Sequence, residues 1–257
     1  MSLVDELFEK SDRKIVKSFT PKSSLCDKIF NLEKTPSLKD EIRDKLLQIT
    51  NEFLDYLGID FFIYDIHLTG SLANYNWSTY SDLDIHIIVD LDEFDESESK
   101  DLVVYHQIVK EFFELKKKLW SSTNDIKIKG HDVELYVQDI DDKGVSTGVY
   151  SILNNEWVVT PEKTQSNIDE TKILQKSEEY GKLIDDLINR AKDGEDVVKE
   201  IDELKEKIKK FRQSGLEKGG EYSYENLTFK LLRRNGYINK LFKTKTYVRS
   251  KKLSLTQ

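Results

Sequence analysis

The sequence has only one cysteine, Cys26, among its 257 residues. A single cysteine excludes a disulfide within the chain and is typical of proteins from a reducing compartment. No basic or histidine-rich cluster adjoins Cys26, which favours an inert, buried thiol over a reactive one. Long apolar runs are also missing: none approaches the roughly 18 residues that a membrane-spanning helix needs, and the N-terminal residues do not resemble a secretory signal. We therefore expect a cytoplasmic protein without a membrane partner.

Internal repeats and low-complexity tracts are absent too, so the chain does not read as a repeat protein. Hydrophobic residues make up 38% of the chain, charged residues 34% and aromatic residues 11%. This composition is typical of a folded protein with a charged surface rather than of a disordered chain. Its length suffices for one large domain or two small ones.

The charge is distributed unevenly along the chain. The net charge is −8, yet residues 226–257 contain nine Lys and Arg and no Asp or Glu. This basic tail has two interpretations, which are an anionic partner such as nucleic acid or packing of the tail on the acidic remainder of the chain. The overall negative charge opposes long-range attraction of nucleic acid.

Hydrophobic periodicity predicts helices mixed with strands in the first part of the chain. Apolar residues at spacings of three and four predict a helix over 36–58, with Gly58 as its stop signal. Residues 61–68 and 82–89 are predicted strands, and Gly70-Ser71 ends the first of them. The other elements predicted before Pro161 are a helix over 102–120, a hairpin at 126–137 turning at Gly130-His131, and a hairpin around Asn154-Asn155.

After Pro161 the pattern becomes helical. Apolar residues at four-three spacing over 173–191 and 197–211 predict two antiparallel helices joined at Asp193-Gly194. We interpret them as a hairpin within the chain rather than as a dimerisation surface. Residues 223–242 predict a further helix, which Gly236 could interrupt. The fold class is therefore α+β, with a mixed domain over residues 1–160 that includes N-terminal helices and a helical domain over 161–257 that ends in the basic tail.

Two carboxylates on the second predicted strand are the first candidates for chemistry. Alternate residues of a strand point to one face, so Asp82 and Asp84 share a face with His86. Carboxylates this close raise each other's pKa unless a cation separates them, and hard oxygen ligands suit Mg²⁺ or Mn²⁺. A third carboxylate on an adjacent strand would complete the site. Glu134 is the candidate, and Asp132 on the same face is the fallback.

Gly70-Ser71 supplies a second kind of group just upstream of the carboxylates. Glycine lets a backbone approach a phosphate closely, and exposed N–H groups at a turn bind anions. The hydroxyl of Ser71 adds a donor. A phosphate cradle beside a metal-binding carboxylate pair describes two-metal nucleotidyl transfer, in which one ion activates the acceptor hydroxyl and the other neutralises the triphosphate and the departing pyrophosphate.

The stretch "TGSLANYNWSTYSDLDIHI" resembles the signature of the DNA polymerase β-type nucleotidyltransferase superfamily. In that superfamily a Gly-Ser turn precedes an acid-x-acid strand, and a third acidic residue lies on a later strand. The motif-bearing residues 61–137 make up under a third of the chain. Other segments of the sequence, including "DIKIKGHDVELYVQD" and "ENLTFKLLRRNGY", are similar to those of uncharacterised nucleotidyltransferase-domain proteins of bacteriophages. The matching positions are Gly70, Ser71, Asp82, Asp84 and Glu134, with Ser81 directly before the acidic pair.

The resemblance implies a small mixed-sheet core flanked by helices, followed by a helical region that helps to hold nucleotide and acceptor. It also implies an NTP-dependent enzyme that moves NMP to a hydroxyl with release of pyrophosphate. Asp82 and Asp84 would ligate the metal, and Glu134 would ligate metal or act as the base. Gly70, Ser71 and Ser81 would hold the nucleotide.

The sequence does not decide the identity of the acceptor or of several further substrate contacts. The basic tail favours an RNA 3′ end, such as that of tRNA, as the acceptor. Two other functions remain, which are a non-catalytic nucleotide- or RNA-binding module of the same fold and an oligonucleotide second-messenger synthase. Lys230 and Arg233 are candidates for contacts to the triphosphate or to RNA phosphates, and a solvated helix face is the alternative. The residues that could stack on a base, or simply pack in their loop, are Tyr75, Trp77 and Tyr80.

Overall fold

A computed structural model describes residues 11–59, 61–94, 102–142, 146–163 and 168–255. The chain divides into two compact units, which are described separately. Residues 21–165 form a sheet unit, and residues 166–257 together with 1–20 form a helical unit. The sequence prediction had kept residues 1–20 with the sheet.

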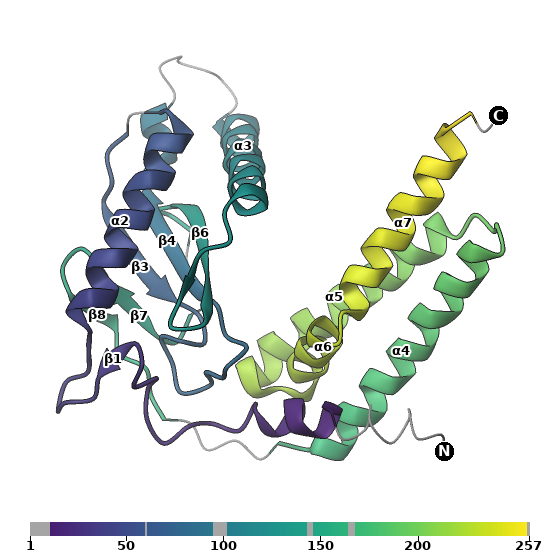
Figure 1. Cartoon of the computed structure of the whole chain (residues 1–257), viewed down its shortest axis with the longest axis horizontal. Helices are drawn as coiled ribbons and strands as arrows, with labels where there is room; N and C mark the ends of the chain where they lie inside the picture. Colours follow the sequence, from purple (N-terminus) through teal and green to yellow (C-terminus); the bar gives the residue numbers. More distant parts are fainter. Residues whose placement is uncertain (1–10, 60, 95–101, 143–145, 164–167, 256–257) are drawn as a thin grey trace. The chain divides into compact units, whose positions relative to one another are not determined.

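The sheet unit contains a six-stranded mixed sheet with the strand order β5-β6-β4-β3-β7-β8 (Figure 1). Of its neighbouring strands, β4 and β6 run parallel, whereas the other pairs are antiparallel. A separate two-stranded ladder joins β1 (Phe30–Asn31) to β2 (Ser37–Leu38). The strands of the large sheet are β3 (Asp65–Thr69), β4 (Leu83–Val89), β5 (Lys127–Ile128), β6 (His131–Asp139), β7 (Val149–Ser151) and β8 (Glu156–Val159).

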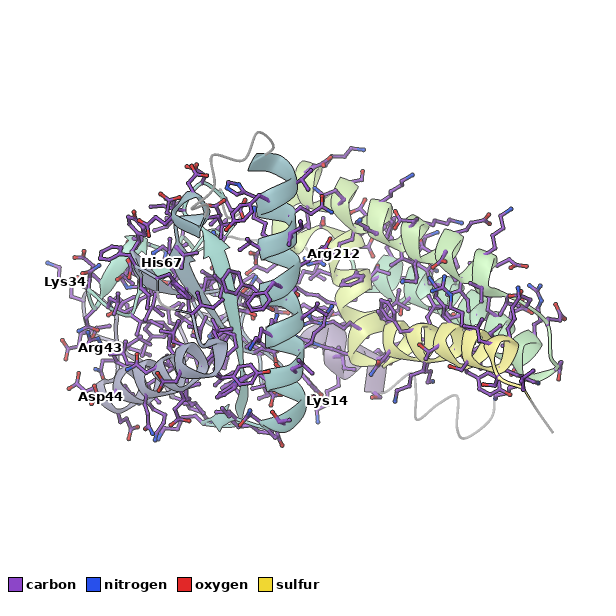
Figure 2. All side chains as sticks on the ribbon, turned by 90° about the horizontal axis from the view of Figure 1, so that it is seen from above. Lys14, Lys34, Arg43, Asp44, His67 and Arg212 are labelled. Atoms are coloured by element: carbon purple, nitrogen blue, oxygen red, sulfur yellow. The ribbon has the colours of Figure 1, made fainter. Side chains whose placement is uncertain are left out.

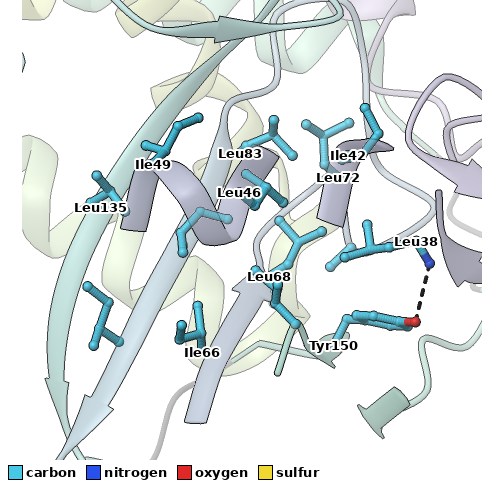
Figure 3. Close-up of a cluster of buried hydrophobic side chains, with 14 of the residues drawn as sticks. Leu38, Ile42, Leu46, Ile49, Ile66, Leu68, Leu72, Leu83, Leu135 and Tyr150 are labelled. Carbon is cyan, nitrogen blue, oxygen red and sulfur yellow. Dashed lines mark hydrogen bonds between the residues drawn. The ribbon is translucent and has the colours of Figure 1, made fainter. Parts of the chain in front are cut away.

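The core of the sheet unit lies between helix α2 (Asp40–Leu57) and one face of the sheet (Figure 3). Apolar side chains spaced three and four apart on α2 face alternate residues of the strands, and burying both sets stabilises the pair. Tyr150 closes one end, where its hydroxyl accepts a hydrogen bond from the Leu38 amide at 3.2 Å and donates one to Asn155 Oδ1 at 2.9 Å. The aliphatic residues of this core include Ile42, Leu46, Ile49, Leu68, Leu83, Ile85 and Leu135.

Helix α3 (Leu102–Thr123) follows the short 3₁₀ turn η1 (Leu91–Phe94) and packs along β6. Phe113 and Trp120 of α3 join the apolar core. Two lysines of the same helix contact acidic residues of β6. Lys110 Nζ lies 3.9 Å from Asp139 Oδ2, and Lys117 Nζ lies 3.7 Å from Glu134 Oε2. α3 therefore contributes both packing and cations to the β6 side of the sheet.

Several predicted element boundaries differ from the observed ones. The helix predicted over 36–58 begins at Asp40, because Ser37–Leu38 pair as a strand with Phe30–Asn31. The strand predicted over 61–68 begins only at Asp65 and extends to Thr69. The hairpin turn lies at Lys129-Gly130 rather than Gly130-His131, because these two residues take the positive φ angles of 52° and 90° that a tight hairpin turn requires.

The described part of the helical unit consists of a short N-terminal helix over residues 11–17, two long helices and two shorter ones, with the 3₁₀ turn η2 (Gly220–Tyr222) between α5 and α6. The predicted apolar residues of the helices over 173–191 and 197–211 are buried from Tyr180 to Ala191 and from Val197 to Ile208 in one cluster that includes residues of the last two helices, whereas Ile173 lies in a second cluster with the N-terminal helix. The predicted break at Gly236 is confirmed, since this glycine has a φ of 75° between two helices. The helices after residue 166 are α4 (Glu170–Lys192), α5 (Val198–Gly219), α6 (Tyr224–Arg234) and α7 (Tyr237–Leu253).

The observed architecture confirms the α+β class, with a mixed sheet followed by C-terminal helices. Within the described ranges, none of the helices has the length and hydropathy that crossing a membrane would require. Cys26 is buried in the sheet unit. Burial raises the pKa of its thiol, which agrees with the predicted inert cysteine.

Candidate functional site

The sheet face opposite the apolar core, here called the polar face, aligns side chains from three neighbouring strands. Thr69 of β3 pairs with Asp84 of β4, which pairs with Glu134 of β6. Neighbouring strands lie about 4.8 Å apart, so the register brings the Asp84 and Glu134 side chains to adjacent positions. The next row on the same face consists of His67, His86 and Tyr136.

Asp82 precedes β4 by one residue and continues its alternation. Leu83, Ile85 and Ile87 are buried in the core, whereas Asp82 and Asp84 are half-buried. This alternation follows from the period of two in a strand. The predicted acidic pair therefore projects from the polar face near the start of β4.

Gly70 lies against the carboxylate of Asp84. Its φ of 73° is in the left-handed region, and a Cβ built on it would lie 2.0 Å from Asp84 Oδ2. Such a distance is far inside van der Waals contact, so only glycine allows the carboxylate to occupy this place. The sequence had predicted that Gly70 makes room for a phosphate. In the structure the group that approaches Gly70 is Asp84.

A hydrogen-bonded chain connects the Gly-Ser turn to the acidic pair. Ser71 Oγ donates to Ser81 Oγ at 2.7 Å, and Ser81 Oγ also accepts a hydrogen bond from the Ser78 amide at 3.0 Å. The Nδ1 of buried His131 on β6 donates to the Ser81 carbonyl at 2.6 Å. These contacts fix the residue directly before Asp82 from two sides. Ser81, which was expected to bind nucleotide, is buried and serves as this link.

Two neighbouring side chains contact the carboxylate of Glu134. Its Oε2 accepts a hydrogen bond from Tyr136 and lies 3.7 Å from Lys117 Nζ. Lys117 Nζ also lies 3.1 Å from the centroid of the Tyr136 ring, a cation–π contact. Burial lowers the pKa of Lys117, while Glu134 and Asp84 act in the opposite direction. Burial and the bond to Glu134 raise the pKa of Tyr136, which keeps its hydroxyl protonated as a donor.

His86 is held in the neutral form beside this group. Its ring stacks on Tyr136 with centroids 4.7 Å apart, and its Nδ1 donates to Gln138 Oε1 at 2.6 Å. Burial lowers the pKa of His86. With Nδ1 carrying the proton, Nε2 retains its lone pair. The predicted neighbour of the carboxylate pair is therefore a packed, hydrogen-bonded histidine.

Asp132 has a different environment from Glu134. It is exposed and forms an ion pair with Lys127 across the β5–β6 hairpin. Lys127 also pairs with Asp125 at 3.2 Å. The register of β4 with β6 puts Glu134 opposite Asp84, which favours Glu134 over Asp132 as the third carboxylate.

The strand register suits a metal ion better than the observed side-chain positions do. The backbone aligns Asp84 with Glu134 and puts Asp82 two residues earlier on the same face, and carboxylate oxygens suit Mg²⁺ or Mn²⁺. In the described part of the chain, however, no three Asp, Glu, His or Cys side chains gather as a metal-binding group. Lys117 and Tyr136 hold Glu134 instead. A metal would be held by Asp82 and Asp84, with Glu134 as the third ligand once it turns from Lys117.

Comparisons of the chain with family models, with curated proteins and with solved structures found no match. The function is therefore inferred from the site itself rather than from similarity.

The aromatic residues of the connecting loop divide into two groups. Trp77 packs against the core and donates its indole N–H to the Ser24 carbonyl at 2.9 Å. Tyr75 also packs against the core, and Lys163 Nζ lies 5.4 Å from its ring. Tyr80 is exposed. Trp77 and Tyr75 thus match the packing interpretation, and Tyr80 is the one of the three whose exposure suits stacking.

Lys230 and Arg233, the other expected nucleotide contacts, lie on α6 in the helical unit. Arg233 is exposed, whereas Lys230 is half-buried. Burial lowers the pKa of Lys230; the charge of Glu221 acts in the opposite direction, whereas the charges of Arg234, Arg233 and Arg212 lower the pKa further. Arg212 of α5, labelled in Figure 2, donates to Asn226 Oδ1 at 3.1 Å. In the part of the chain that the structure describes, Lys230 forms no hydrogen bond or ion pair.

We expect the substitution Lys230→Met to increase the free energy of unfolding at pH 7 by about 1 kcal/mol, because it removes a partly desolvated cation from among other cations. The difference from wild type should narrow as the pH rises towards 10.5, the ordinary pKa of lysine, since wild-type Lys230 then loses its charge as well. Urea unfolding at several pH values measures both effects.

The control for this measurement is Lys243→Met, which removes an exposed lysine from α7. It should change the free energy of unfolding by less than about 0.5 kcal/mol. Calorimetric titration with an NTP then tests the ligand contact: Lys230→Met should weaken binding and Lys243→Met should not. A Lys230→Met protein that is less stable than wild type would show that the cation cluster stabilises the fold, contrary to our expectation.

Three residues that contact the candidate site were not among the sequence candidates. Lys117 is one of three consecutive lysines, and nothing in the sequence distinguishes it from Lys116 or Lys118. Tyr136 had a detectable signal, since it lies two residues after Glu134 on a predicted strand and so shares its face. His131 was placed in the hairpin turn, which concealed its position at the start of β6.

Proposed function

We propose that the chain is a metal-dependent nucleotidyltransferase that moves NMP from an NTP to a hydroxyl acceptor and releases pyrophosphate. The observation that carries the proposal is the cross-strand register of Asp84 with Glu134, with Asp82 two residues earlier on the same face. The contact of Asp84 with Gly70 supports it further, because it joins the Gly-Ser turn to the acidic pair. The mixed sheet with α2 on its apolar face is compatible with a nucleotidyltransferase core.

In this proposal each group of the polar face has one task. Asp82 and Asp84 hold a Mg²⁺ or Mn²⁺ ion, with Glu134 as the third ligand or as the base that takes the proton of the acceptor hydroxyl. The ion would supply charge neutralisation at the phosphates. The backbone at Gly70-Ser71 binds the triphosphate. Tyr136 and Lys117 orient Glu134 through the contacts described above.

The basic tail does not point to a single kind of partner. Two cations of the basic tail are paired within the helical unit, since Lys252 Nζ lies 2.8 Å from Asp196 Oδ2 and Lys245 forms an ion pair with Asp202. These pairs favour packing of the tail on acidic residues for part of its charge. Lys230 and Arg233, which the sequence offered as contacts to phosphates, keep an RNA 3′ end as the acceptor in the proposal.

A second candidate function is a nucleotide-binding module of the same fold that does not catalyse transfer. The specific observation in its favour is the ion pair of Lys117 with Glu134, which offers a lysine where the third carboxylate would otherwise meet a metal ion. Such a module would bind an NTP without releasing pyrophosphate. The two functions therefore give different results in one assay.

The test incubates the purified full chain with Mg²⁺ and each labelled NTP in turn, with and without total tRNA. Pyrophosphate release and transfer of label together establish nucleotidyl transfer, and dependence on tRNA identifies RNA as the acceptor. Binding of an NTP without pyrophosphate release under any condition supports the non-catalytic module. If the double variant Asp82→Asn, Asp84→Asn releases pyrophosphate as fast as wild type, the proposed site is wrong.

We expect Lys117→Met to tighten binding of Mn²⁺ roughly threefold to tenfold, because it removes a positive charge 3.7 Å from Glu134 Oε2 while keeping an apolar stem over Tyr136. Electron paramagnetic resonance of Mn²⁺ titrated into the nucleotide-free protein measures this affinity. The control is Lys118→Met, an exposed neighbour on the same helix. Equal affinities in wild type and Lys117→Met would mean that Glu134 takes no part in binding the ion.

A further inference from the structure

Helix α3 has apolar side chains on two faces, although only one of them packs against its own unit. Val109, Phe113 and Trp120 face the core. A second face of the helix carries five large apolar side chains that are 36% to 60% exposed. We call this row the α3 stripe, and its members are Val104, Ile108, Phe112, Leu115 and Leu119.

The spacing of the α3 stripe is that of a helix–helix seam. Successive members lie four, four, three and four residues apart, so Ile108, Phe112, Leu115 and Leu119 alternate as the two core positions of a heptad. The stripe runs over about 22 Å at 1.5 Å per residue. Single exposed apolar residues are ordinary on a protein surface, but a continuous row at heptad spacing is typical of a surface that binds another helix.

We infer that the α3 stripe is the contact surface of a homodimer in which α3 packs antiparallel against α3 of a second copy. In that arrangement Phe112 of each copy meets Leu115 of the other, and Ile108 meets Leu119. The four central layers of the seam are therefore filled by residues of the stripe itself, and Val104 at each end meets Thr123 of the other copy. A two-fold axis then closes the assembly at two copies.

The charges beside the α3 stripe identify a second copy as the occupant. Glu111 and Lys118 are both exposed and lie seven residues apart on one flank of the seam. In the antiparallel register given by the apolar layers, Glu111 of each copy lies beside Lys118 of the other, which makes two opposite-charge contacts per dimer. In a parallel pair the residues beside Glu111 and Lys118 would be Lys116 and Thr123 of the other copy.

One helix from each copy buries less than the roughly 800 Å² per partner of a standard interface. We therefore expect a dimer that dissociates on dilution. Sedimentation velocity of the full chain over roughly 1 to 300 µM should show a monomer at the low end and a dimer at the high end. A monomer throughout this range would overturn the inference.

The double variant Ile108→Gln, Leu115→Gln tests whether this surface carries the association. Both side chains are exposed, so the variant should fold as wild type does, and dimerisation should weaken at least tenfold. The matched control is Leu183→Gln, which changes an exposed leucine of α4 in the other unit and should leave the dimer unchanged. A dimer that persists in the double variant would place the interface elsewhere and overturn the inference.

A charge-exchange cycle tests the antiparallel register. Glu111→Lys alone and Lys118→Glu alone each put like charges side by side, and each should weaken the dimer about threefold at low salt. The double variant should restore wild-type affinity. In a parallel pair the double variant would not restore it, because Glu111 and Lys118 do not meet there, and this outcome would overturn the antiparallel register.

Discussion

The substitution Asp84→Asn is expected to reduce kcat/KM for nucleotidyl transfer at least roughly 10³-fold, which corresponds to about 4 kcal/mol of transition-state stabilisation. Asn has the shape of Asp, so the contact with Gly70 is preserved while the negative charge is lost. That charge is what would hold the cation against the phosphates in the proposed reaction. Pyrophosphate release under steady-state conditions measures the change.

Asp132→Asn is the matched control for this prediction. Asp132 lies on β6 two residues before Glu134, but it is exposed and paired with Lys127. Its replacement should change kcat/KM by less than about threefold, since an exposed ion pair contributes little. Glu134→Gln should instead resemble Asp84→Asn. If Asp132→Asn lost activity and Glu134→Gln kept it, Asp132 would be the third carboxylate and the register argument would be wrong.

Thermal unfolding distinguishes lost chemistry from lost structure in these variants. The three carboxylate-to-amide changes keep the side-chain volume, and two of the three positions are half-buried rather than buried in the core. We expect each melting temperature to stay within a few degrees of wild type, as for surface substitutions in general. A variant that loses activity without such a change has lost the function of its carboxylate.

The parts of the fold that local sequence determines were predicted well. The amphipathic helix ending at Gly58, the alternation of Asp82 and Asp84 with buried residues and the break at Gly236 all follow from spacing and backbone preference over a few residues. The start of α2 was wrong because it depends on pairing of Ser37–Leu38 with a strand that the sequence pattern does not announce. Two-residue strands carry no detectable periodicity.

The candidate site could be predicted only in part, because its geometry depends on contacts between distant residues. The sequence suggested Glu134 as a third carboxylate, but its position opposite Asp84 depends on the parallel register of two strands separated by α3 and β5. Lys117 lies on that intervening helix, and its contact with Glu134 follows from how α3 packs on β6. Neither relation has a local signal.

Gly70→Ala is expected to combine a loss of stability with a loss of activity. The positive φ of Gly70 costs alanine about 1 kcal/mol, and the added Cβ, 2.0 Å from Asp84 Oδ2, must displace that carboxylate. We expect the free energy of unfolding to fall by about 2–4 kcal/mol in total. Displacing a reacting group by about 1 Å costs roughly 10²-fold in rate, so kcat/KM should fall by that factor or more.

Gly58→Ala distinguishes backbone strain from the clash with Asp84, because alanine at position 58 causes only the backbone strain. Gly58 ends α2 with a φ of 68°, and no atom lies within 4 Å of the Cβ that alanine would add there. It should lose about 1 kcal/mol of stability from backbone strain and keep its transfer rate. The excess loss in Gly70→Ala then measures the contact with Asp84. Equal losses of stability and equal transfer rates in the two variants would mean that Asp84 moves away without consequence, and the role assigned to its carboxylate beside the Gly-Ser turn would have to be abandoned.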